Sequence, residues 1–169
     1  MQNKQPRFTK LSKFTRWFAI QFFPAWLVTF AFASLFHTLC VLVNLSALDV
    51  FIPWFTWLTT IVGDFIGLLP TYGVIIAVAL CIAFGATITL IRWCQQSARP
   101  LSALPILLLF SLSGGVAIAV TLLAMQPIMN ITLIAGSRGT LGFMLQSGAG
   151  VLGGALFGLR SIQKQNINY

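Results

Sequence analysis

The chain has 169 residues, of which 58% are hydrophobic and only 7% are charged. Soluble globular domains are about 45–50% apolar and about 25% charged, so this composition argues against a soluble domain and against a disordered or collagen-like chain. Ten Lys and Arg stand against two Asp and Glu, which gives a net charge of +8. Such an excess can indicate a nucleic-acid binder, but the positions of these residues favour a membrane topology signal. We therefore expect no nucleic-acid partner.

Four apolar stretches are long enough to cross a bilayer, whose hydrocarbon core of about 30 Å needs roughly 20 helical residues. The sequence predicts an all-α integral membrane protein, a four-transmembrane-helix bundle within a single membrane domain over residues 17–161. Pro24 lies inside the first span and would kink it. A cleaved signal peptide ending near Ala33 is the alternative for this span, but the apolar run continues well past Ala33, which favours a retained helix. The expected spans are residues 17–45, 71–93, 101–126 and 140–160.

The two ends of the chain lie outside these spans. Residues 1–16 mix Lys and Arg with apolar side chains, which predicts a basic amphipathic segment that contacts anionic lipids. A topology anchor without further function is the alternative. Residues 162–169 form a short tail, which we expect on the same side as the N-terminal segment.

The stretch between the first two spans is apolar, but Asp49 and Asp64 bracket it. Trp54 and Trp57 suit a membrane–water interface, where amphipathic rings prefer to lie. We therefore expect an interfacial or re-entrant helix at about residues 50–69. If this stretch crossed the membrane as a fifth span, Asp64 would be buried and the basic residues that follow would change sides.

The basic residues predict the orientation of the chain, because Lys and Arg are retained on the cytoplasmic side. With four spans, nine of the ten basic residues fall on one side and only Arg138 falls on the other. We expect a multi-pass protein of the bacterial inner membrane with both termini cytoplasmic. The two acidic residues then lie on the outer side, as Arg138 does.

Rows of small residues, spaced four apart, predict close helix crossings, because lipid-embedded helices pack where small side chains let the backbones approach. The fourth span carries the strongest row, which has two overlapping GxxxG units and also includes Gln146. A compact bundle with close crossings is one interpretation of these rows, and the alternatives are a partner helix docking on the fourth span or a mobile glycine-rich gate. The partners we expect are a second copy of the chain or another membrane protein. The glycines expected to pack are Gly142, Gly150, Gly154 and Gly158 in the fourth span, Gly85 in the second and Gly115 in the third.

Polar residues gather toward the outer side of the predicted bundle, where they suggest a binding site. Helix amino-termini attract anions, and Arg138 adds a planar fork of donors before the fourth span. A structural ion pair of Arg138 with Asp64 or Asp49 is the alternative to an anion site. For His37 and Gln146 the alternative is a hydrogen bond between helices. The candidate residues for this outer anion or polar site are Gly136, Ser137, Arg138, Gly139, Gln146, His37 and Asp64.

The sequence contains no catalytic motif, no metal-ligand spacing and no cofactor fingerprint that we recognise. It predicts a non-enzymatic subunit or accessory protein of a membrane assembly. One alternative is a small oligomeric transporter or channel, and another is a membrane enzyme acting on lipid through His37, Asp64 and Arg138. A water-filled path along Gln146 and His37 would favour transport, whereas a dry bundle with an exposed glycine row would favour a partner.

Overall fold

The computed structural model describes residues 7–47, 53–97, 102–129 and 140–167, and within these ranges the chain is helical with no strand. Four helical stretches of the described chain are long and apolar enough to cross a membrane, namely Thr15–Ser46, Trp54–Gln96, Ala103–Met125 and Thr140–Gln163. Helices dominate because lipid cannot satisfy backbone polar groups, so each segment must satisfy its own. The prediction of an all-helical, multi-pass membrane protein is confirmed. The elements are α1 (Arg7–Ser46), α2 (Trp54–Leu68), the π-helical turn η1 (Leu69–Gly73), α3 (Val74–Ser97), α4 (Ala103–Met129) and α5 (Thr140–Ile167).

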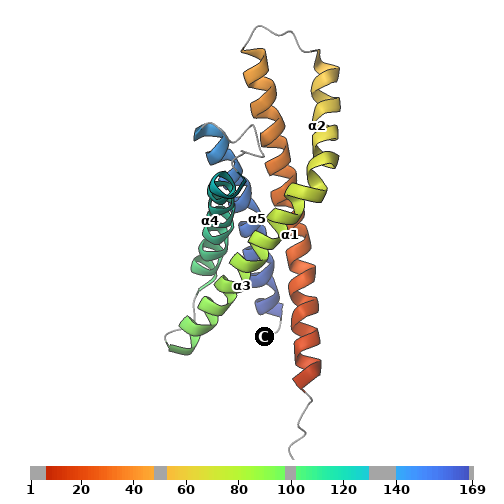
Figure 1. Cartoon of the computed structure of the whole chain (residues 1–169). Helices are drawn as coiled ribbons and strands as arrows, with labels where there is room; N and C mark the ends of the chain where they lie inside the picture. The colour runs from red at the N-terminus through yellow and green to blue at the C-terminus, as the bar shows by residue number, and fades with distance from the viewer. Residues whose placement is uncertain (1–6, 48–52, 98–101, 130–139, 168–169) are drawn as a thin grey trace, which may run out of the picture.

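Helix α1 has 40 residues and continues through Pro24. It begins inside the basic segment, earlier than the predicted span. At 1.5 Å per residue it is ~60 Å long, about twice the thickness of a hydrocarbon core. Figure 1 shows that α1 extends beyond α5 at both ends, and that the described chain begins and ends at the same end of the bundle.

The predicted outer helix and the second span are parts of one bent helical stretch. Helix α2 lies beside the carboxyl-terminal part of α1, and η1 joins it to α3 without a break (Figure 1). Pro70 lies in η1, and because proline lacks an N–H it disturbs the regular helical hydrogen bonds and favours such a bend. The continuous candidate span Trp54–Gln96 therefore starts well before the predicted residue 71. Whether α2 lies at the membrane interface stays a prediction.

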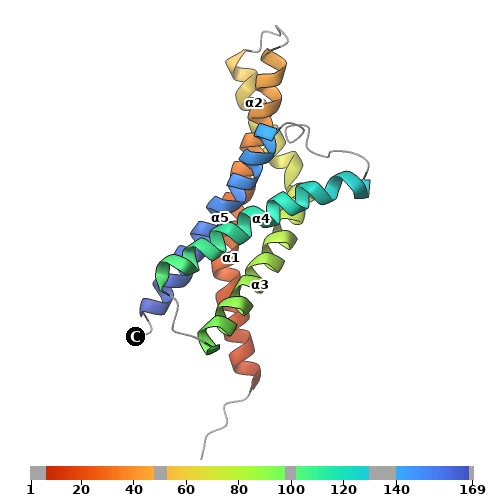
Figure 2. The same ribbon diagram turned by 90° about the vertical axis from the view of Figure 1, so that its left-hand side faces the viewer.

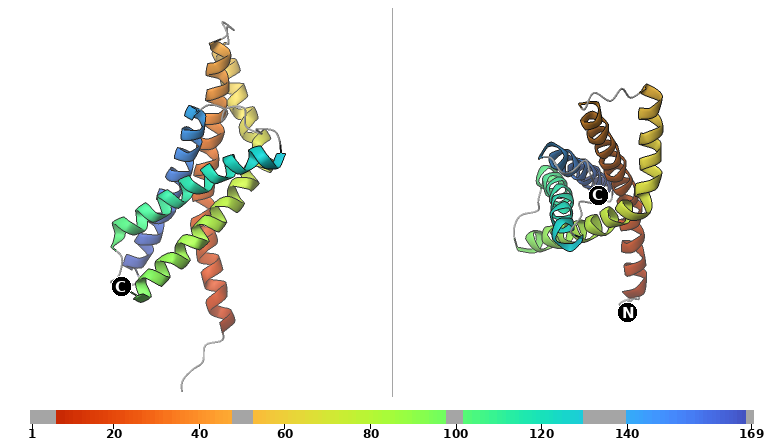
Figure 3. Two further views of the ribbon diagram at one scale, coloured as in Figure 1. Left: turned by 60° about the vertical axis from the view of Figure 1, so that its left-hand side comes forward. Right: turned by 45° about the horizontal axis from the view of Figure 1, so that its top comes forward.

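Helix α5 is the centre of the bundle. In the right panel of Figure 3, α5 lies between α4 and α1, and α2 lies on the far side of α1. Figure 2 shows α4 crossing α5 obliquely while α3 runs close to α4. Because α5 is flanked on both sides, it needs two faces on which other backbones can approach.

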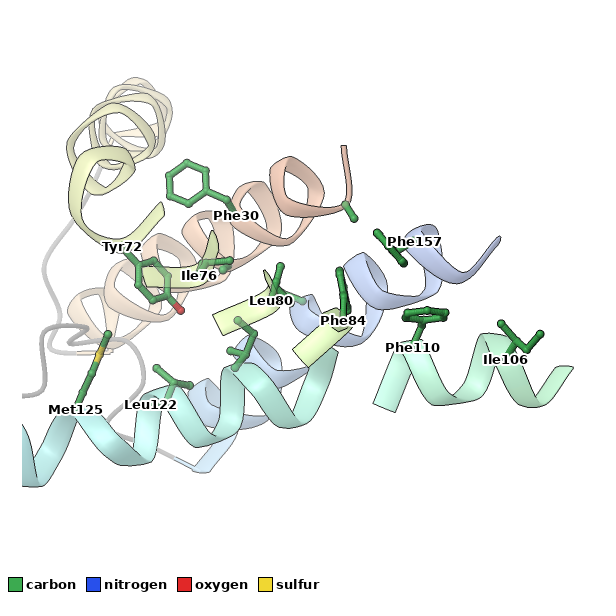
Figure 4. Close-up of a cluster of buried hydrophobic side chains, with 14 of the residues drawn as sticks. Phe30, Tyr72, Ile76, Leu80, Phe84, Ile106, Phe110, Leu122, Met125 and Phe157 are labelled. Atoms are coloured by element: carbon green, nitrogen blue, oxygen red, sulfur yellow. The ribbon is translucent and has the colours of Figure 1, made fainter. Parts of the chain in front are cut away.

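The core of the bundle is aromatic. Phe84 and Phe157 stack with ring centroids 4.5 Å apart, and Phe110 lies 4.9 Å from Phe157. These rings come from α3, α4 and α5 and point toward one another (Figure 4). All three are almost fully buried. Large apolar side chains on the outer faces, such as Ile82 and Leu112, are exposed and would contact lipid tails.

Candidate functional site

The loop of the predicted anion site lies outside the described residues. Gly136, Ser137, Arg138 and Gly139 belong to residues 130–139, and Asp49 belongs to residues 48–52. The anion site and the alternative ion pair of Arg138 with Asp64 or Asp49 therefore both stay predictions. The other three candidate residues, His37, Asp64 and Gln146, are described.

Two of these three residues meet where α2 packs against α1. Asp64 is half-buried on α2, and its Oδ2 accepts a hydrogen bond of 2.9 Å from the hydroxyl of Thr38, which is fully buried on α1. His37 is half-buried beside Thr38 and interacts electrostatically with Asp64. We call Asp64, Thr38 and His37 the outer polar cluster. The sequence prediction grouped His37 with Asp64 but did not include Thr38. A threonine is common in an apolar helix and gives no sign of a site by itself.

Gln146 lies in a different contact, at the junction of α1, η1 and α5. Its Nε2 donates to the carbonyl of Ala33 at 2.9 Å, and its Oε1 accepts from the Tyr72 hydroxyl at 3.0 Å. Gln146 and Tyr72 are both buried. The amide thus has a hydrogen-bond partner at each end, as the interhelical alternative expected. A second bond fixes η1 to α1, because Trp26 Nε1 donates to the Gly73 carbonyl at 2.8 Å.

A third polar contact was not predicted. Ser161 of α5 donates to Gln21 Oε1 of α1 at 3.0 Å, and both residues are buried. One signal could have revealed it. Gln21 stands four residues before Ala25 and so extends the small-residue row of the first span by one position.

These contacts order the polar groups along α1. From Gln21 to Ala33 the helix rises ~18 Å, and Thr38 lies ~7 Å further, at 1.5 Å per residue. The total of ~25 Å is close to the thickness of a hydrocarbon core. The outer polar cluster and the Gln21–Ser161 pair therefore suit the two edges of the apolar layer, with Gln146 between them.

The space between Gln146 and Ser161 is filled with rings. Phe157 stacks on Phe84, and Phe18 lies against Phe157 with centroids 5.7 Å apart. Among the described residues, every buried side-chain nitrogen or oxygen atom has a hydrogen-bond partner. These ring contacts lie between the level of Gln146 and that of the Gln21–Ser161 pair.

The predicted packing glycines occupy different environments. A Cβ added at Gly154 would lie 2.8 Å from the Phe110 carbonyl carbon, and one at Gly158 would lie 3.3 Å from Leu107 Cα, so both glycines abut the α4 backbone. Gly150 faces Gly114 of α4 in the same way. Gly153, which the predicted row omitted, faces α1, where an added Cβ would lie 2.8 Å from the Ala25 carbonyl oxygen.

The remaining three glycines differ among themselves. An added Cβ at Gly115 would lie 2.6 Å from Val151 Cγ2 of α5, so this glycine is at a close contact. At Gly85 it would meet nothing within 4 Å, so the expectation that Gly85 packs is wrong within the described chain. The same four-spaced row also contains Gly73, where an added Cβ would lie 3.5 Å from Phe30 of α1, so the row contacts another helix at one end and not at Gly85. Gly142 is buried and lines a groove.

That groove lies between the carboxyl-terminal part of α1 and the start of α5. Its volume is about 340 Å³. Apart from Asn44 its lining is apolar, which suits a hydrocarbon group better than an anion. The lining residues are Leu39, Cys40, Val43, Asn44, Leu141, Gly142 and Leu145.

Within the described ranges, no three His, Cys, Asp or Glu residues lie close enough to hold a metal ion. The side chains of this part of the chain that bond between helices include Thr38 with Asp64, Gln146 with Tyr72, and Ser161 with Gln21. No protein-family model matches the chain, and no curated protein or solved structure matches it either.

Proposed function

We propose that the protein is a non-enzymatic subunit or accessory protein of a membrane assembly. It binds its partner through small residues of α2 and α3 that face away from the rest of the bundle. The distribution of basic residues supports an inner-membrane location with both termini cytoplasmic. The basic N-terminal segment would contact anionic lipids there.

The observation that carries the proposal is the open space at the glycines of α2 and α3. An added Cβ at Gly63, Gly67 or Gly85 would meet nothing within 4 Å. Gly63 and Gly67 form a four-spaced row with Thr59, and all three are exposed on a helix that has no buried residue. Such rows let a second backbone approach closely within lipid. On α5, by contrast, internal contacts already occupy Gly150, Gly153 and Gly154, and the open Gly148 has Met144 and Leu152 rather than small residues four positions away.

The interior of the bundle supports a binding function over transport. Phe84, Phe110 and Phe157 fill the space through which a water-lined path from Gln146 would have to continue. The polar atoms that such a path would use are already bonded to neighbouring helices.

The test is purification of the full chain in mild detergent, with identification of co-purifying proteins. A Gly63→Leu/Gly67→Leu variant should lose the partner, because leucine fills the row. The matched control is Val62→Leu/Ile66→Leu, which changes two exposed neighbours of the same helix that lie outside the row. The glycine variant should still fold, since nothing lies near either glycine. The proposal fails if no specific protein co-purifies, or if the glycine variant retains the partner as fully as the control does.

A further inference from the structure

The outer polar cluster has an unusual distribution of hydrogen-bond acceptors. The Thr38 hydroxyl lies 2.9 Å from Asp64 Oδ2 and 3.1 Å from the carbonyl oxygen of Ser34. A hydroxyl has one proton to donate and two lone pairs to accept with. The single Thr38 proton is therefore shared between two acceptors, one of which is a carboxylate oxygen.

We propose that Asp64 and Thr38 form a proton-binding site at the contact between α1 and α2. When Asp64 takes a proton from water, the new O–H donates to Thr38 Oγ1, and the Thr38 hydroxyl donates to the Ser34 carbonyl. All three groups are then bonded and the carboxyl is neutral. Loss of the proton again leaves the single Thr38 proton between the Asp64 carboxylate and the Ser34 carbonyl.

The site suits a proton better than a metal ion. Its described oxygens are two from the Asp64 carboxylate, one from Thr38 and one from the Ser34 carbonyl, whereas hard cations such as Mg²⁺ or Ca²⁺ take about six or more. Within the described residues, α2 packs against only α1 and η1 to any extent. The titratable groups on those two elements near the site are His37, which interacts electrostatically with Asp64, and Tyr72, whose hydroxyl is bonded to Gln146.

Proton binding would control the position of α2. This helix has no buried residue, and the Thr38 hydroxyl of α1 donates a hydrogen bond to its Asp64. One aromatic contact accompanies it, with ring centroids of Phe30 and Phe65 5.0 Å apart. Leu69 and Pro70 at the start of η1, ahead of the bonded Tyr72 and Gly73, provide a hinge, since π-turns and prolines interrupt helix hydrogen bonding. Neutral Asp64 should hold α2 against α1, and ionised Asp64 should favour the separated, more hydrated state.

The experiment measures the distance between spin labels on α1 and α2 of the full chain in lipid nanodiscs as a function of pH. The labels are placed at Leu45 and Leu58, which are both exposed. The three free cysteines, Cys40, Cys81 and Cys94, are first replaced by alanine. Between about pH 4 and about pH 9, a range that covers carboxyl and imidazole groups, the short-distance population of the parent should fall several-fold as pH rises.

Three variants and one control identify the responsible group. Asp64→Asn should keep the short distance at every pH, because its amide can donate to Thr38. Thr38→Val should lose the short distance between the labels at every pH, because valine has no hydroxyl to bond to Asp64. The matched control is Thr29→Val, which alters a fully buried threonine of α1 whose hydroxyl bonds only to its own helix, at Ala25. It should behave as the parent. His37→Gln should keep the pH response.

The proposal is overturned if the parent shows no pH response, or if Asp64→Asn responds as the parent does. It is also overturned if His37→Gln abolishes the response, because His37 would then be the titrating group. A distance that changes with added Na⁺ at fixed pH, and not with pH, would assign the site to a metal ion instead. None of these results depends on the proposed membrane partner.

Discussion

Gly154→Ala tests the close crossing of α4 and α5 with the smallest possible change. The added Cβ would lie 2.8 Å from the Phe110 carbonyl carbon and 3.0 Å from Ser111 Cα, and would also clash with the Phe110 carbonyl oxygen. All of these are backbone atoms, so no side-chain rotation can relieve the contact. The helices themselves must move apart.

The expected loss follows from that movement. Carbon atoms pack best at about 3.5–4.0 Å, so the backbones must separate by roughly 0.5–1 Å, which forfeits a quarter to a half of each contact at the crossing. Overpacking of this kind costs about 1–3 kcal/mol, and replacing glycine by alanine in a helix returns up to about 1 kcal/mol. Because the obstruction is backbone, we expect a net loss of about 2 kcal/mol.

Gly148→Ala is the matched control, since Gly148 lies on the same helix and an added Cβ there would meet nothing within 4 Å. It should gain up to about 1 kcal/mol from helix propensity. The two variants should therefore differ by roughly a hundredfold in the equilibrium constant for unfolding. The measurement is reversible unfolding in mixed micelles of dodecyl maltoside and sodium dodecyl sulfate, followed by tryptophan fluorescence. Equal stability of the two variants would refute the α4–α5 contact described above.

Three further predictions use the same unfolding measurement. Gln146→Leu should destabilise the protein by about 1–3 kcal/mol, because it leaves the buried Tyr72 hydroxyl without its partner. Adding Tyr72→Phe should recover part of that loss. A double variant that is no more stable than Gln146→Leu would contradict this prediction. Ser161→Ala should cost about 0.6 kcal/mol, the average for a hydrogen bond between membrane helices, and should cost nothing once Gln21 is leucine. Trp26→Phe removes the donor to the Gly73 carbonyl and should also cost about 0.6 kcal/mol of stability. An unchanged stability would mean that this bond does not help to hold η1 against α1.

The apolar pattern of the sequence was enough to predict the four membrane-spanning stretches. Lipid offers the backbone no hydrogen bonds, so any apolar run of sufficient length must become a helix. The joining of α2 to α3 was harder to predict. Pro70 marks an interruption in the sequence, but only the structure shows that the helix bends there rather than ends.

The candidate site was likewise predictable from the sequence only in part. The sequence singled out Gln146, His37 and Asp64 because polar groups are rare in such a chain, but it could not assign their partners. Thr38 and the Ala33 carbonyl carry no sequence signal, since every helix has backbone carbonyls and many have threonines. These contacts depend on which turn of one helix lies beside which turn of another.

Composition and residue spacing by themselves determined that this is a multi-pass helical membrane protein and that its small residues lie in rows. A row specifies a face of one helix, but it does not specify what that face meets. Neighbouring residues on a helix point about 100° apart, so Gly153 can face α1 while Gly154 faces α4. Gly73 and Gly85 share one four-spaced row, yet Gly73 lies against Phe30 and Trp26 of α1 while an added Cβ at Gly85 would meet nothing within 4 Å. Only the tertiary structure decided between these outcomes, because the crossing geometry depends on all the helices together.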